Sequence, residues 1–188
     1  MSYRRFLAGV GMLVGSMVVR GAVKGLFAGV EGPVLALLIC LHNWFTVLGF
    51  SGFIALSAPL IDEYTTIMAR RTLPANRYAK LRRRDAWLKS LLLRRPEALA
   101  LPLSLIIIVS SLMKSGVTGA YQLLALLVSP HTYLEFAAIY LSLRCATLEY
   151  LEGRGCLPRT LLYAFLVLLA GGAVEVWVFP VIMGILTG

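Results

Sequence analysis

Apolar residues along this chain fall into long blocks instead of short alternating patches. Blocks of this length fit helices that cross a lipid bilayer, which need about 20 consecutive apolar residues. A transmembrane barrel would show shorter segments of alternating polarity, and isolated strands in lipid would leave backbone groups unpaired. The pattern therefore predicts an all-α protein. The blocks that we expect to cross are Phe6–Val30, Pro33–Leu60, Ala98–Met113, Pro130–Leu148 and Thr160–Gly188.

The apolar stretch Val117–Leu148 is too long for one untilted crossing, and Pro130 interrupts it. Proline removes a backbone donor and ends or kinks a helix. We expect a short re-entrant or interfacial helix over Gly119–Val128, followed by a true crossing over Pro130–Leu148. The predicted fold is a polytopic transmembrane helical bundle with about five crossings, forming a single integral membrane domain over residues 1–188.

The net charge of +9 is concentrated in one segment. A basic segment between two apolar blocks is typical of a cytoplasmic loop, so Ile61–Arg95 is predicted to be cytoplasmic, with the amino terminus inside and the carboxyl terminus outside. Within it, Ala79–Leu93 has the composition of an amphipathic helix lying along the membrane. This distribution favours anionic lipid headgroups or an acidic partner over nucleic acid. The residues that we expect to make this contact are Arg82, Arg83, Arg84 and Lys89.

The overall composition agrees with a membrane location. Apolar residues make up 59% of the chain and charged residues 14%, with a mean hydropathy of +0.83, which is outside the range of soluble domains. No cleavable signal peptide is evident, because Arg20 and Lys24 continue the first apolar block. The chain has two Asn and one Gln, and this scarcity of thermolabile amides fits a thermophilic source.

Three cysteines, Cys40, Cys145 and Cys156, show no paired metal-ligand spacing. An odd number without such spacing predicts apolar packing residues or free cytoplasmic thiols, and no disulfide framework.

The first apolar block is rich in glycine. Small residues four apart lie on one face of a helix and let another helix approach closely, so this block is a predicted helix-packing surface. In the same block Arg20 and Lys24 lie one turn apart. They either snorkel to an interface or pair with buried carboxylates. The glycines of the predicted packing surface are Gly11, Gly15, Gly21, Gly25 and Gly29.

Glu175 is the only formal charge in the last apolar block. A carboxylate at bilayer depth is costly and normally faces the bundle interior, a partner or a wet cavity. Its candidate counter-ions are Arg20, Lys24 and Arg144. Either it forms a buried structural pair with one of them or it takes part in function.

A second polar site begins at Ser129-Pro130, a pair suited to open a helix because serine caps free amides and proline is favoured in the first turn. His131 and Glu135 then lie four residues apart on one side of that helix. They bind an anion, share a proton, dock a basic group or simply stabilise the break. His42 and Asn43 are further polar residues at bilayer depth, and such residues usually bond across a helix interface.

These residues do not make a convincing metal or catalytic site. His131 and Glu135 offer two ligands and His42 a third, whereas zinc sites use three or four well-placed ligands. No nucleophile has a base beside it in the sequence. We therefore expect no metal, no cofactor, no catalytic residues and no enzymatic activity.

Three elements resemble those of the stage II sporulation protein M family. Ser129–Ile139 resembles its Pro-His-Gly…Glu-Leu-x-Ala element, with Thr132 in place of the glycine. Val174–Pro180 resembles its closing Ile-Glu-x-Phe-x-Thr/Ser-Pro element, and His42–Gly52 its early Asn-Asn span. The resemblance implies a non-enzymatic integral membrane protein, of which the sporulation member holds peptidoglycan-degrading partners. The residues of this chain that match the family's motif positions, and that the resemblance implies are functional, are His131, Glu135, Glu175 and Asn43.

These observations lead to two functional hypotheses. The leading hypothesis is a non-enzymatic platform or permease-like subunit of a larger membrane complex, homodimeric or bound to other membrane proteins. The alternative is a small transporter or channel in which Glu175, Glu135 and His131 bind a proton or solute. Membrane lipid is the expected environment in both cases.

Overall fold

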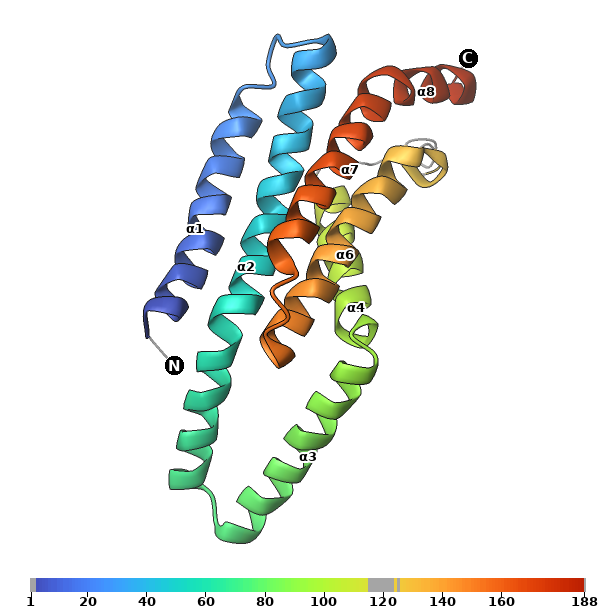
Figure 1. The fold of residues 1–188 in the computed structure, drawn as a ribbon. Coiled ribbons are helices and arrows are strands. Elements are labelled where there is room, and N and C mark those ends of the chain that lie inside the picture. The colour runs from blue at the N-terminus through green and yellow to red at the C-terminus, as the bar shows by residue number, and fades with distance from the viewer. Residues whose placement is uncertain (1–2, 115–123, 125, 188) are drawn as a thin grey trace.

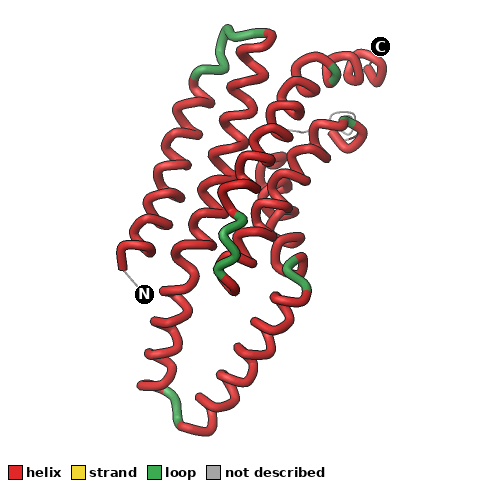
Figure 2. Tube along the Cα trace, viewed as in Figure 1, coloured by secondary structure: helices red, strands yellow, loops and turns green. Residues whose placement is uncertain are grey.

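Helices make up nearly all of the chain that the computed structural model describes, which is residues 3–114, 124 and 126–187 (Figures 1 and 2). No strand occurs within those ranges, so the predicted all-α class is confirmed. The predicted helix Gly119–Val128 lies mostly outside the described residues. The helices are α1 (Tyr3–Gly25), α2 (Gly32–Thr72), α3 (Ala75–Arg94), α4 (Glu97–Lys114), α6 (Pro130–Glu152), α7 (Leu157–Trp177) and α8 (Phe179–Thr187).

Three helical stretches are long and apolar enough to cross a membrane, judged by length and composition: α1, α2 and Leu157–Leu186, which joins α7 and α8. A shorter apolar helix covers Glu97–Ser110. A helical bundle of membrane-protein type is therefore supported, while five crossings and their orientation remain predictions.

The first two apolar blocks, Phe6–Val30 and Pro33–Leu60, form separate helices as their separation predicts, with a break at Gly32-Pro33. Gly32 has a φ of +64°, in the left-handed region that favours glycine, and Pro33 lies in the first turn of α2. The helix then runs for 41 residues to Thr72 and passes through Pro59. At 1.5 Å per residue this is roughly 60 Å, about twice the thickness of a hydrocarbon core.

The expected loop Ile61–Arg95 is instead a helical hairpin made of the end of α2, a short turn and α3 (Figure 1). The sequence did not predict the helix over residues 61–72, because charged residues end an apolar block without ending a helix. The position of this segment between two crossings stays a prediction. The predicted helix Ala79–Leu93 is present within the longer α3. It runs back from the hairpin turn toward α4 (Figure 1), and its position along the membrane stays a prediction.

Lys89 joins the two arms of this hairpin. Its Nζ lies 2.6 Å from Oδ2 of Asp62 on α2 and 3.1 Å from Oδ2 of Asp85 on α3. Burial lowers the pKa of Lys89, but its hydrogen bonds to the two carboxylates act in the opposite direction and leave the pKa above its ordinary value. Lys89 is therefore engaged inside the hairpin, whereas Arg82, Arg83 and Arg84 are exposed.

The core of the bundle is built around α2, which packs against α1, α6 and α7, while α4 packs on α6. Many of its buried residues are small, which allows close helix approach in lipid. The packing of α1 falls almost entirely on α2. The core residues are Cys40, Val47, Ala100, Ala138, Ile139, Leu143, Ala164 and Leu168.

Different glycines from those predicted make the close contacts. A Cβ added at Gly49 would lie 2.9 Å from Cβ of Ser16 on α1, and one at Gly52 would lie 2.9 Å from the sulfur of Met12. Gly9 similarly faces Ser57. The predicted set, Gly11, Gly15, Gly21, Gly25 and Gly29, has nothing within 4 Å of an added Cβ. Those glycines are turned away from the described bundle and do not pack within it.

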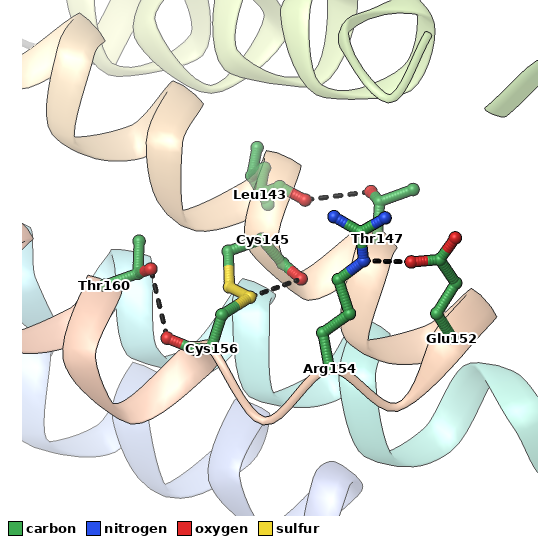
Figure 3. The surroundings of a disulfide bond; sticks show 7 residues. All are labelled: Leu143, Cys145, Thr147, Glu152, Arg154, Cys156 and Thr160. Carbon is green, nitrogen blue, oxygen red and sulfur yellow. Dashed lines mark hydrogen bonds and ion pairs between the residues drawn. A yellow bond between two sulfur atoms is a disulfide. The ribbon is translucent and has the colours of Figure 1, made fainter. Parts of the chain in front are cut away.

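Cys145 and Cys156 form a disulfide at the junction of α6 and α7, with a Cα–Cα distance of 6.3 Å (Figure 3). The prediction of no disulfide was wrong for this pair, while Cys40 is a buried free thiol. Gly153 and Gly155 both have a φ of +65°, which turns the chain back on itself within the eleven positions that separate the cysteines. The two glycines were the sequence signal that a short turn could bring the thiols together.

The last predicted crossing, Thr160–Gly188, is divided at Val178 into α7 and α8. Pro180 explains the division, since proline lacks a backbone donor and clashes with the preceding turn. The helix α8 leaves the direction of α7 at the end of the bundle opposite the α2–α3 hairpin (Figure 1).

Candidate functional site

Four helices bring ionisable and amide side chains together near the end of the bundle opposite the α2–α3 hairpin (Figure 1). Ionisable groups are costly inside a membrane bundle, so a concentration of them points to a site. We call this set the polar cluster: Arg20 on α1, His42 and Asn43 on α2, His131 and Glu135 on α6, and Glu175 on α7.

Arg20 and His42 are hydrogen bonded in a way that defines the state of the imidazole. The Nε of Arg20 donates to Nε2 of His42 at 2.9 Å, so Nε2 carries no proton. The other ring nitrogen, Nδ1, lies 3.2 Å from the backbone oxygen of Arg20 and donates to it. His42 is thus a neutral acceptor that orients Arg20 without cancelling its charge.

Glu135 interacts with three other members of the polar cluster. Asn43 donates a hydrogen bond from Nδ2 to Oε1 of Glu135, joining α2 to α6. Glu135 also interacts electrostatically with Arg20 and with Glu175. Two carboxylates and one guanidinium, all partly buried, therefore lie near enough to interact electrostatically.

The candidate counter-ions of Glu175 are not paired with it in the described structure. No carboxylate of the described chain lies within 4 Å of a charged nitrogen of Arg20, Lys24 or Arg144. Arg144 is exposed, and it follows Glu135 by nine residues on α6, about 13 Å along the helix. Lys24 is exposed as well. Arg20 is the half-buried cation of the cluster, and the exposed Lys24 interacts electrostatically with His42.

Two adjacent glycines let α7 approach the other helices. A Cβ on Gly171 would touch Cβ of Leu134 at 3.6 Å and Cγ of Glu135 at 4.0 Å. A Cβ on Gly172 would lie 2.5 Å from the backbone oxygen of Ala36 on α2. Glu175 follows Gly171 by one helical turn on the same face, so this close packing is what brings the two carboxylates together.

The imidazole of His131 contacts Ser129, two residues earlier, and Phe179 of α8. The prediction that Ser129 caps the helix amides was wrong. Instead the fully buried Oγ of Ser129 lies 2.6 Å from Nδ1 of His131, and no side-chain cap bond is formed. The imidazole also meets the ring of Phe179 edge-on, with centroids 5.3 Å apart. The start of α6 is therefore tied to the start of α8.

A small cavity of about 60 Å³ opens among members of the polar cluster. His131 and Glu135 both face it, as their helical spacing predicts, and Arg20, Asn43, Thr46 and Thr132 supply further polar groups. The apolar part of its wall comes from Ile107, Ile108, Leu126 and Ile139.

A larger cavity of about 280 Å³ lies between α1, α2 and α4, with Leu143 of α6 in its wall. Arg20, Thr46 and Ile107 line both cavities, so the two adjoin one another. The larger cavity is mainly apolar, and sequence reasoning missed it because its walls come from four separate helices.

Metal and hydrolytic chemistry find no support in the described residues. Within them, no three His, Cys, Asp or Glu residues are grouped so as to hold a metal ion. Ser104 is fully buried and donates to the backbone oxygen of Ala100 at 2.6 Å, as a helix-bonded serine does. The chemistry that the polar cluster supports is the binding of charge and protons.

Comparison of the chain with protein-family models, with curated proteins and with solved structures found no match.

Proposed function

We propose that this protein is a small membrane transporter in which Glu135 and Glu175 bind and release a proton during the transport cycle. The observation that carries the proposal is the electrostatic interaction of Glu135 with both Glu175 and Arg20, across the close contact of Gly171 with Glu135, while Arg20 has no ion pair in the described chain. Ionisable groups inside a membrane bundle are costly and mark ion pathways or proton relays. The arrangement favours transport over a purely structural platform.

The charge balance of the polar cluster explains how it works as a proton site. Two ionised carboxylates and one guanidinium carry a net charge of −1, whereas one added proton makes the group neutral. A net charge is strongly disfavoured in a low-dielectric interior. Whether Glu135 and Glu175 hold a proton therefore depends on any other charge that enters the polar cluster. Asn43 holds one oxygen of Glu135 and leaves the other for the proton.

The small cavity supplies a route to these carboxylates. Its volume of about 60 Å³ corresponds to about two water molecules at their share of liquid volume. Thr132, His131 and Glu135 provide donors and acceptors along its wall. Water molecules bonded to these groups would connect Glu135 to the end of the bundle at which α6 begins.

The proposed topology has five crossings, made by α1, α2, α4, α6 and the α7–α8 stretch, with the basic α2–α3 hairpin in the cytoplasm. The concentration of Arg and Lys on that hairpin supports the orientation. The α6–α7 junction, which the Cys145–Cys156 disulfide joins, lies toward the same end of the bundle (Figure 1). Intracellular disulfides are a feature of hyperthermophiles, which agrees with the scarcity of amides in the chain.

Proton flux into proteoliposomes tests the proposal directly. The purified chain, reconstituted with an imposed pH gradient and a pH-sensitive dye inside, should carry protons. Glu175→Gln should abolish that flux while leaving helix content and detergent elution volume unchanged. Glu31→Gln is the matched control, because Glu31 is an exposed carboxylate in the α1–α2 turn. Absence of pH-dependent flux in the unaltered protein would overturn the proposal.

A second candidate function, an assembly subunit of a larger membrane complex as in the stage II sporulation protein M family, rests on a separate observation. The outward glycines of α1 have open space around them and lie beside exposed apolar residues such as Val14 and Val18. This face would accept another transmembrane helix closely.

Native mass spectrometry of the protein from host membranes tests this second function. Gly15→Leu should remove a partner or second copy from the complex, whereas Gly184→Leu on α8 should not. An unchanged complex would count against assembly through α1.

A further inference from the structure

We infer that the larger cavity binds a small organic anion whose carboxylate pairs with Arg20 and whose apolar body lies between α1, α2 and α4. The inference rests on the proposed transport function and names the class of solute that the transporter would carry. It is drawn from the polarity of the cavity wall, the unpaired charge of Arg20 and the size of the cavity.

The wall of the larger cavity changes from polar to apolar along the bundle. The helix α1 runs from the hairpin side toward the polar cluster, α2 runs the opposite way, and α4 runs with α1 (Figure 1). Arg20, Thr46 and Ser110 therefore all lie at the end nearest the cluster. Residues seven or eight positions away on the same helices line the other end, about 10–12 Å distant. These are Leu13, Ile54 and Leu103.

The positive charge of Arg20 has no carboxylate of the described chain in contact with it. Its Nε is used by the neutral His42. In the described chain, the guanidinium has neither a carboxylate within 4 Å nor a second side-chain hydrogen bond. Guanidinium carries five N–H donors in a planar fork that fits a carboxylate through two parallel bonds. A carboxylate at the polar end of the cavity would complete this arrangement.

The size of the cavity limits the apolar body that the carboxylate can carry. A volume of about 280 Å³ corresponds to about nine water molecules and lies just below the range of drug-sized ligand sites. One aromatic ring or a short chain fits, whereas a lipid with two acyl chains does not. Phe45 and Phe50 in the wall favour a ring through edge-to-face contact. The cavity therefore fits a free small acid better than a lipid.

Benzoate and its neutral isostere benzamide test the inference on the full chain. The protein is placed in nanodiscs of zwitterionic lipid, and binding is measured by isothermal titration calorimetry. Benzoate should bind at least about tenfold more tightly than benzamide, because only benzoate carries the charge that Arg20 recognises. Arg20→Gln should remove that difference between the two compounds.

A second variant keeps the test valid if Arg20→Gln fails to fold. Ile106 lines the cavity but is 60% exposed, so Ile106→Trp should fill the cavity and abolish benzoate binding without replacing a residue of the polar cluster. Leu105→Trp is its control, because Leu105 is 49% exposed on the same helix and does not line the cavity. Benzoate affinity should be unchanged in that variant.

Three results would overturn the inference. The first is equal affinity for benzoate and benzamide, and the second is an equal effect of the two tryptophan variants on benzoate affinity. The third is displacement of benzoate when phosphatidylglycerol replaces part of the zwitterionic lipid. The last result would assign the cavity to a lipid headgroup. The binding test is independent of flux. Proton transport without selective benzoate binding removes only this inference, and selective binding without proton transport removes only the transport proposal.

Discussion

Gly172 on α7 lies against the backbone of α2 so closely that a Cβ would be 2.5 Å from the carbonyl oxygen of Ala36. Only glycine fits here without a shift, because the obstacle is backbone and not the end of a flexible side chain. Glu175 is three residues further on, so the same contact sets its distance from Glu135 and from the α2 side of the polar cluster. A packing contact thus determines the geometry of the proposed proton site.

Gly172→Ala should therefore destabilise the protein by about 1–3 kcal/mol, the usual cost of overpacking a close contact. It should also weaken proton flux, because α7 has to move away from α2. The measurement is the thermal unfolding midpoint in detergent, followed by the liposome assay. Gly184→Ala on α8 is the control, since an added Cβ there meets nothing within 4 Å. Equal midpoints for the two variants would contradict the close packing of α7.

Asn43→Leu should cost about 2 kcal/mol, because it removes the donor to Glu135 and leaves a partly buried carboxylate without that bond. The exposed Asn76→Leu is a matched control, since Asn76 accepts only a local hydrogen bond from the backbone of Arg77. Chemical denaturation in mixed micelles measures both. If Asn43→Leu is no less stable than Asn76→Leu, the α2–α6 hydrogen bond contributes nothing to stability.

Reduction of the Cys145–Cys156 disulfide should lower stability by roughly 3 kcal/mol, the loop-closure estimate for a sequence separation of eleven. Dithiothreitol should therefore lower the unfolding midpoint of the unaltered protein. The double variant Cys145→Ala and Cys156→Ala should start from the lower midpoint and show no further change. Mass spectrometry after alkylation should find one free thiol, that of Cys40, before reduction and three afterwards. Three alkylated thiols without reductant would disprove the disulfide.

Lys89→Met should loosen the α2–α3 hairpin, because it removes two ion pairs and leaves Asp62 and Asp85 to repel one another. Pairs of this exposure contribute up to about 1 kcal/mol each, enough to widen a distance distribution. Double electron–electron resonance between spin labels at Thr65 and Arg84 measures it. Lys80→Met is the control, as Lys80 is exposed and has no ion pair within the described helices. Equally narrow distributions in both variants would rule out this role.

Lys89 also makes the stability of the α2–α3 hairpin depend on pH at high pH, where the lysine loses its proton. Because the folded-state pKa of Lys89 is raised, its contribution is fully present below the ordinary value of 10.5 and is lost as pH rises through the folded value. The label distances should therefore be constant from neutral pH to about pH 10 and broaden only above that. Broadening near neutrality would mean that another group holds the hairpin.

Much of the polar cluster can be predicted from local sequence pattern. The Ser129-Pro130 start and the four-residue spacing place His131 and Glu135 on one side of α6, and both face the same cavity. Their partners could not be predicted in this way. Arg20 was one of three candidate cations, and nothing in the order of residues distinguishes it from Lys24, which is one turn away but exposed. The choice depends on which face of α1 packs against α2.

Residue type and local spacing are enough to predict that this protein is helical, that long apolar blocks suited to crossing a membrane occur along it, and that Glu175 needs an unusual environment. These properties arise within one or two helical turns. The meeting of Glu175 with Glu135, the bond between Cys145 and Cys156, and the outward direction of the α1 glycines appear only in the folded chain. They depend on how helices far apart in the sequence approach one another, and that approach is set by single contacts such as Gly172 against Ala36.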